Sequence, residues 1–102
     1  MSWQGQISTM VRYLISDVDP SNYKYSPRRM ETTILVAAQM LTTETDLNEE
    51  YTINVETCTL DPDPTDALTK DDDFISLVSL KAACVMLGGE IRAEAGNAIA
   101  VK

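Results

Sequence analysis

The sequence contains no histidine and only two cysteines, Cys58 and Cys84, and these absences exclude several kinds of chemistry. Without histidine, neither a Ser-His-Asp triad nor a Cys-His pair can form, and no metal-ligand spacing is present. Gly88-Gly89 follows a helix rather than preceding one, which is the wrong context for a phosphate-binding loop. We therefore expect no enzyme activity, no metal site and no cofactor.

Basic residues are also scarce, because eight Lys and Arg stand against sixteen Asp and Glu, for a formal net charge of −8 and a pI near 4.2. Such a chain should be repelled by nucleic acid and by anionic membranes. No apolar run reaches the length of about 18 residues that spans a membrane, and the N-terminus lacks a signal-peptide pattern. We expect no membrane association.

Aromatic residues number only six, so the core of this 102-residue chain must be aliphatic and rich in alanine. A length of 102 residues predicts a single domain over 1–102. The acidic segment 61–66 lacks the glycine of a calcium loop, and its two prolines stiffen the backbone, which favours a turn. We expect Cys84 to act as a small buried hydrophobic residue, with a disulfide to Cys58 as the alternative.

The most apolar stretch runs from Asp71 to Leu87 and predicts a central helix. Three aspartates open it, at the positions where carboxylates cap free backbone N–H groups. The spacing predicts one buried face, formed by Phe74, Leu77, Val78, Cys84, Val85 and Gly88. The remaining positions are also mostly apolar, so the helix has to be covered nearly all round. Either the rest of the chain wraps this helix or other copies of the chain cover it.

The other elements are predicted from their hydrophobic periodicity and from the residues that start or end helices and strands. A first helix begins at Ile7, with Met10, Leu14 and either Ile7 or Val11 inward, and residues 17–24 form a loop. Ser26-Pro27 is a helix start, and the second helix continues to about Thr43, with Met30, Ile34, Ala37, Ala38 and Leu41 along its buried face. Alternation over 51–55 predicts a strand that returns over 58–60 as a hairpin. The expected fold is mainly α, a small bundle of three to four helices with a hairpin between the second and third.

The chain ends are the least regular parts of the sequence. Residues 1–6 are short and polar around Trp3, which we expect to lie in a loose terminus, with a contact anchor as the alternative. Gly88-Gly89 should stop or kink the central helix. We expect the apolar tail 98–102, which contains Ile99 and Val101, either to be cut short or to pack on something outside this chain.

The order of these elements resembles the head–tail connector proteins of tailed bacteriophages, also called adaptor, neck or head-completion proteins. The resemblance covers about residues 8–101. It rests on the start of the second helix and its continuation, the strand, the Asp-Pro turn and the central helix, that is, on Tyr25-Ser26-Pro27-Arg28-Arg29-Met30-Glu31, Ala37-Ala38-Gln39, Tyr51–Val55, Asp73-Phe74-Ile75 and Leu80-Lys81-Ala82-Ala83-Cys84.

The resemblance implies a structural virion protein that forms a ring, commonly of twelve copies, below the portal. The ring would join the DNA-filled head to the tail and line part of the DNA channel, where DNA passes without specific binding. Its partners would be other copies of the chain, the portal protein, and tail-side neck or tail proteins. Its location would be the neck of the virion, and the host cytoplasm during assembly.

Two arginines at the start of a helix are electrostatically misplaced, which suggests an acidic partner or another subunit, although their residue type alone favours solvated surface residues. Under the resemblance, Arg28 and Arg29 would pair with acids of an adjacent subunit or of the portal. The hairpin 51–60 would protrude toward the tail-side ring. The expected interface residues are Arg28, Arg29, Tyr51, Ile53, Val55, Ile99 and Val101.

An alternative reading is a small acidic regulator, either a DNA mimic or an antitoxin-like inhibitor, that binds a basic partner. Such a protein needs carboxylates spaced like phosphates along one face. In this sequence the carboxylates gather in loops and at helix starts, which disfavours the alternative.

Overall fold

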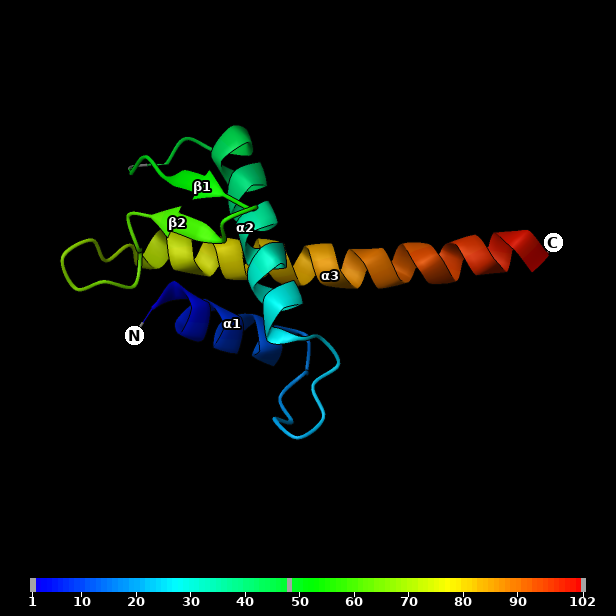
Figure 1. The fold of residues 1–102 in the computed structure, drawn as a ribbon. Helices are drawn as coiled ribbons and strands as arrows, with labels where there is room; N and C mark the ends of the chain where they lie inside the picture. Colours follow the sequence, from blue (N-terminus) through cyan, green and yellow to red (C-terminus); the bar gives the residue numbers. More distant parts are fainter. Residues whose placement is uncertain (1, 48, 102) are drawn as a thin grey trace.

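The computed structural model describes residues 2–47 and 49–101, with the side chains of 2–47 and 49–88. Within these residues the chain forms three helices and one antiparallel hairpin (Figure 1). The elements are α1 (Trp3–Leu14), α2 (Pro27–Glu44), β1 (Thr52–Asn54), β2 (Thr59–Asp61) and α3 (Asp72–Val101). The expected mainly α fold, with a hairpin between the second and third helices, is confirmed.

The two shorter helices pack on the N-terminal half of α3 (Figure 1). Helix α1 lies along α3, whereas α2 crosses α3 at a steep angle and also contacts α1 and β1. The hairpin lies beside the start of α3. The C-terminal half of α3 extends beyond the other elements, so the molecule measures 54 × 34 × 24 Å.

Helix α2 begins where the sequence predicts. The Ser26 side chain accepts a hydrogen bond from the Arg29 N–H at 3.2 Å, and Pro27 occupies the first helical position, where its missing N–H costs nothing. The inward residues of α2 are fully or nearly fully buried, and all but Leu35 were predicted to face inward. They are Met30, Ile34, Leu35, Ala37, Ala38 and Leu41. They form the middle of the core.

Helix α1 begins at Trp3, four residues before the predicted start, and the expectation of a loose N-terminus was wrong. The Trp3 side chain is 3% exposed, and its backbone N–H donates to Asp63 Oδ2 at 3.3 Å. Ile7 and Val11 are fully buried, whereas Leu14, predicted to face inward, is 50% exposed. Burial of the large indole ring explains why the short polar terminus becomes helical.

Helix α3 starts with the predicted carboxylate cap, because Asp71 Oδ1 accepts a hydrogen bond from the Phe74 N–H at 3.2 Å. The predicted stop or kink at Gly88-Gly89 was wrong, since the helix runs without interruption to Val101. No described glycine has a positive φ, so the pair adopts ordinary helical geometry. Glycine in a helix interior costs only about 1 kcal/mol relative to alanine, which the helix formers on either side overcome.

The inward face of α3 is only partly the predicted one. Phe74 and Val78 are buried as expected, but Leu77 is 41% exposed and Cys84 is also exposed, so their predicted burial was wrong. The buried side chains of α3 are Phe74, Ile75, Val78, Ser79, Ala82, Ala83 and Met86. Because apolar residues occupy both faces, the periodicity could not tell which one the core would use.

The hairpin pairs β1 with β2 antiparallel, with Ile53 opposite Leu60. Its turn includes Cys58, whose φ of 59° lies in the left-handed region. Cys58 is half-buried against the core, and both thiols are free, so the structure does not contain the alternative disulfide.

Candidate interaction surface

The outer side of α3, opposite the core, carries an unpartnered row of apolar side chains. We call this row the α3 stripe; it consists of Leu77, Leu80, Cys84 and Leu87, at helical steps of three, four and three. The leucines are 41%, 55% and 39% exposed, respectively. Isolated surface leucines are ordinary, but a row of them along one helix marks a surface that another molecule can cover.

The N-terminal end of the α3 stripe opens into a small cavity of about 150 Å³. We call it the Leu77 notch, and its lining is Thr45, Asp46, Leu47, Asp71, Asp73, Phe74 and Leu77. Apolar side chains of Leu47, Phe74 and Leu77 contribute to its walls together with three carboxylates. The notch therefore offers an apolar contact and a negative potential at the same place.

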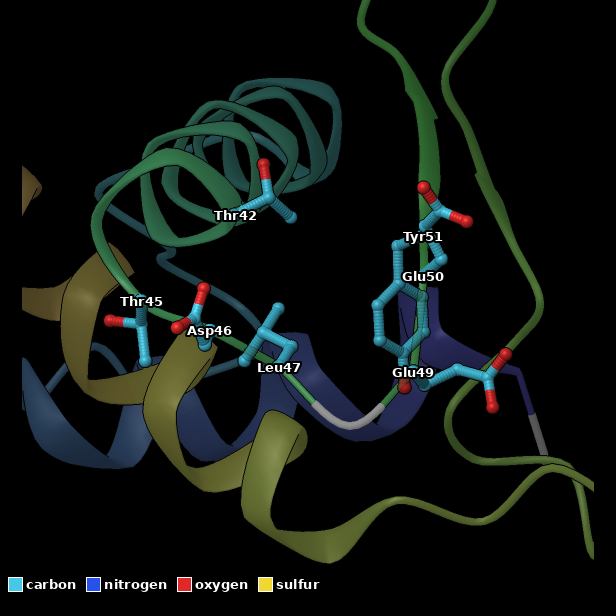
Figure 2. Close-up of a pocket in the computed structure, with 7 residues that line it drawn as sticks. All are labelled: Thr42, Thr45, Asp46, Leu47, Glu49, Glu50 and Tyr51. Carbon is cyan, nitrogen blue, oxygen red and sulfur yellow. The ribbon is translucent and has the colours of Figure 1, made fainter.

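A larger hollow of about 500 Å³ adjoins the notch and shares three of its residues (Figure 2). Its lining comes from the end of α2 and the segment that leads into β1, and consists of Thr42, Thr45, Asp46, Leu47, Glu49, Glu50 and Tyr51. Eleven of the sixteen acidic residues, but only one of the eight basic residues, fall within 44–73. This part of the chain thus carries most of the negative charge.

Among the described residues, no group of three Cys, Asp or Glu side chains is arranged to hold a metal ion. Several of these carboxylates instead cap backbone N–H groups, as Asp63 does for Thr65 and Asp66 for Leu68. The predicted turn chemistry of segment 61–66 is therefore confirmed.

Tyr51, predicted to lie in a partner interface, belongs instead to the core of the subunit. It is 9% exposed, and its ring stacks on Phe74 with centroids 3.9 Å apart. Its hydroxyl donates to Asp71 Oδ2 at 2.7 Å, which joins the hairpin side of the molecule to the cap of α3. Burial, together with the hydrogen bond to Asp71 and the negative charge of that carboxylate, raises the pKa of the Tyr51 hydroxyl well above its usual value.

The other predicted interface residues belong to two elements, the hairpin and the C-terminal half of α3. Ile53 in β1 is half-buried against the core, and Val55 at the hairpin turn is 39% exposed. Ile99 and Val101 belong to α3, but their side chains lie outside the described residues. The structure therefore does not bring this set together into one surface.

Arg28 and Arg29 are both exposed in the first turn of α2, as their predicted role requires. The Arg29 guanidinium lies 4.9 Å from the centroid of the Tyr25 ring, and the Lys24 ammonium lies 5.5 Å from it. Exposed apolar side chains occur at the end of α1 and in the following loop, with Tyr13 75% exposed. We call this set the basic corner; it consists of Tyr13, Leu14, Val18, Lys24, Arg28 and Arg29.

A buried ion pair holds the loop behind the basic corner, and the sequence interpretation missed it. Arg12 Nη1 lies 2.7 Å from Asp17 Oδ2, and Arg12 Nη2 donates to the Tyr25 carbonyl at 3.0 Å. Asp17 also accepts hydrogen bonds from the backbone N–H groups of Lys24 and Tyr25, at 2.8 and 3.3 Å. The signal in the sequence was an arginine beside the apolar face of α1, followed by an aspartate five residues later.

Comparison of the chain with protein-family models, with curated proteins and with solved structures finds no match. Within the part of the chain that the structure describes, no helix combines the length and apolarity needed to cross a membrane.

Proposed function

We propose that this chain is a head–tail connector subunit that forms a ring between the portal and the tail of a bacteriophage. The observation that carries the proposal is the α3 stripe. A helix that is apolar on opposite sides needs cover on both, and the fold of one chain covers only the side that faces α1 and α2. Further copies of the same chain would supply the missing cover.

A ring is the closed assembly that suits such a chain. A contact between two different surfaces of identical subunits repeats from copy to copy and closes when the rotation between neighbours permits. The long α3, whose C-terminal half extends past the other elements in Figure 1, offers additional surface to neighbours or to the portal. The proposed partners are therefore other copies, the portal protein and tail-side neck proteins.

The charge of the chain also supports this role. A net charge of −8, concentrated in 44–73, gives a surface that repels the phosphate backbone. A channel lined by such a surface would let DNA slide through without binding it. We place the protein in the neck of the virion, and in the host cytoplasm before assembly.

The test is the mass of the assembly, measured by native mass spectrometry of the chain alone and after addition of the cognate portal protein. The expected result is a closed ring of about twelve copies, formed alone or on the portal, together with recovery of the chain from purified particles. A chain that stays monomeric with the portal and is absent from particles would contradict the proposal. Strongly salt-dependent binding of such a monomer to a basic protein would favour the acidic regulator.

A further inference from the structure

We propose that the basic corner of one copy docks against the Leu77 notch and the adjoining α3 stripe of the next copy. This inference rests on the proposed ring and names the two surfaces that would join neighbouring subunits. The occupant of the α3 stripe is thus a second copy of this chain. Charge, exposed apolar area and rigidity of the two surfaces each support the assignment.

The charges of the two surfaces are complementary. The exposed Arg28 and Arg29 belong to the basic corner, whereas Asp46, Asp71 and Asp73 line the notch. Opposite charges across an interface steer association and fix its register, and like charges oppose the wrong pairings. A contact between the basic corner of one copy and the Leu77 notch of another places opposite charges against each other.

The ends of α2 supply an independent electrostatic argument. Its first turn contains two arginines and no acid, and its last turn contains Glu44 and no base. At each end of α2, the charged side chains therefore have the sign that the helix dipole disfavours. Glu44 is offset by its ion pair with Lys81 at 3.0 Å. A neighbour that presents carboxylates to the first turn of α2 would remove the remaining cost.

Both surfaces contain exposed apolar side chains. In the basic corner, Tyr13, Leu14 and Val18 are 75%, 50% and 52% exposed. In the α3 stripe, Leu77 and Leu80 are 41% and 55% exposed. Exposed apolar side chains together with charged residues are the ordinary composition of a protein interface.

Both surfaces are also held in place before any contact forms. The Arg12–Asp17 ion pair and its backbone hydrogen bonds fix the loop of the basic corner. The Tyr51 hydroxyl and the Phe74 N–H both bond to the Asp71 carboxylate, which fixes the wall of the notch. Surfaces that are ordered in the free subunit lose little conformational entropy when they associate.

The two surfaces differ, so the contact is head-to-tail. Each copy that uses its corner on one neighbour keeps its own notch for the next, which extends the assembly until it closes. A two-fold pairing of α3 stripes is the competing arrangement. That pairing would bring Cys84 of one copy close to the same residue of another and would leave the basic corner unused.

The experiment measures self-association by sedimentation equilibrium at low and high salt. Two charge-reversal variants are compared with the wild-type chain: Arg28→Glu with Arg29→Glu, and Asp46→Lys with Asp73→Lys. Each variant alone should associate at least about tenfold more weakly, because like charges then face each other. An equimolar mixture of the two should recover association, since every corner then meets a notch of opposite charge.

Controls separate the contact from folding and from net charge. Glu56→Lys changes the charge of an exposed hairpin residue outside both surfaces and should associate as the wild type does. Circular dichroism of each variant should match the wild type. Leu80→Ser, which replaces an exposed side chain and keeps the charge, should also weaken association and tests the stripe separately.

Four results would overturn the inference: a wild-type chain that stays monomeric up to millimolar concentration, arginine variants that associate normally, a mixture that fails to recover, or rapid Cys84–Cys84 crosslinking on oxidation. These outcomes are distinguishable from failure of the proposed function. If rings still form on the portal when the chain carries Arg28→Glu with Arg29→Glu, the result would contradict this contact but not the connector role. If the mixture recovers association but no ring forms on the portal, the result would support this contact and contradict the connector role.

Discussion

Arg12 and Asp17 form an ion pair of 2.7 Å in which both side chains are almost fully shielded from water. The pair joins the last turn of α1 to the loop that leads into α2. Arg12 also lies 3.6 Å from the centroid of the Tyr23 ring, so the guanidinium contacts an aromatic face as well as a carboxylate. Loss of either partner would leave a buried charge without compensation.

Removal of the Asp17 carboxylate should make the unfolding free energy less dependent on pH. Burial raises the pKa of Asp17, but the N–H groups of Lys24 and Tyr25 and the charge of Arg12 outweigh it and lower that pKa below its ordinary 3.8. The folded state therefore gains stability above about pH 4 and loses it as pH falls through the lower folded pKa. Asp17→Asn should cost about 2 kcal/mol at neutral pH.

Urea unfolding at neutral pH and at acid pH measures this effect. The difference in unfolding free energy between the wild type and Asp17→Asn should shrink below about pH 4. Asp19→Asn is the matched control, because Asp19 is exposed in the same loop and caps only Ser21. An equal difference at both pH values would show that the carboxylate charge of Asp17 does not stabilise the fold.

Trp3 should report burial of the N-terminus directly, since it is the only tryptophan in the chain. At 3% exposure its fluorescence emission should be blue-shifted and weakly quenched by acrylamide, and both properties should revert on unfolding. Trp3→Ala should lower the unfolding free energy by about 3–5 kcal/mol through the cavity it leaves. Water-exposed emission from the folded chain would contradict the placement of α1.

The Tyr51 hydroxyl and the Tyr51 ring should contribute separately to stability. Tyr51→Phe retains stacking on Phe74 but removes the hydrogen bond to Asp71, and should cost about 1 kcal/mol. Tyr51→Ala also removes the buried ring and should cost several times more. Equal losses in chemical denaturation of the two variants would mean that the ring does not pack in the core.

Phe74 and Leu77 lie one helical turn apart in α3, but truncation to alanine should cost far more stability at Phe74 than at Leu77. Phe74 is 1% exposed, so Phe74→Ala should cost about 3–5 kcal/mol of subunit stability. Leu77 is 41% exposed, so Leu77→Ala should cost under about 1 kcal/mol in the isolated subunit. Denaturation at concentrations that keep the chain monomeric distinguishes the two, and a large loss at Leu77 would place that residue in the core.

The parts of the fold that the sequence predicts are those with unambiguous local signals. Ser26-Pro27 and the inward residues of α2 were predicted correctly because caps and a mixed polar–apolar pattern leave one solution. The buried face of α3 was not predicted correctly, because apolar residues on all its sides do not indicate which side faces the core. The Trp3 ring is buried in the core, and its backbone N–H bonds to Asp63, sixty positions away; no local pattern encodes either contact.

The candidate surface shows the same division. The exposure of Arg28 and Arg29 follows from their place in the first turn of a surface helix. The Leu77 notch depends on how the end of α2 meets the start of α3, which periodicity does not contain. Tyr51 directly precedes β1 and fits the predicted alternation, yet alternation alone does not indicate whether its side chain meets a partner or its own core.

Gly88 gives the last prediction, because helical glycines that touch nothing are sites where alanine should stabilise. A Cβ added at Gly88 meets no atom within 4 Å, and the backbone there is helical. Gly88→Ala should therefore raise helix stability by about 0.5–1 kcal/mol, measured by thermal unfolding and helical circular dichroism. Gly88→Pro removes a backbone donor and should shorten the helix. If alanine instead lowers the helical signal, the uninterrupted α3 through this position is incorrect.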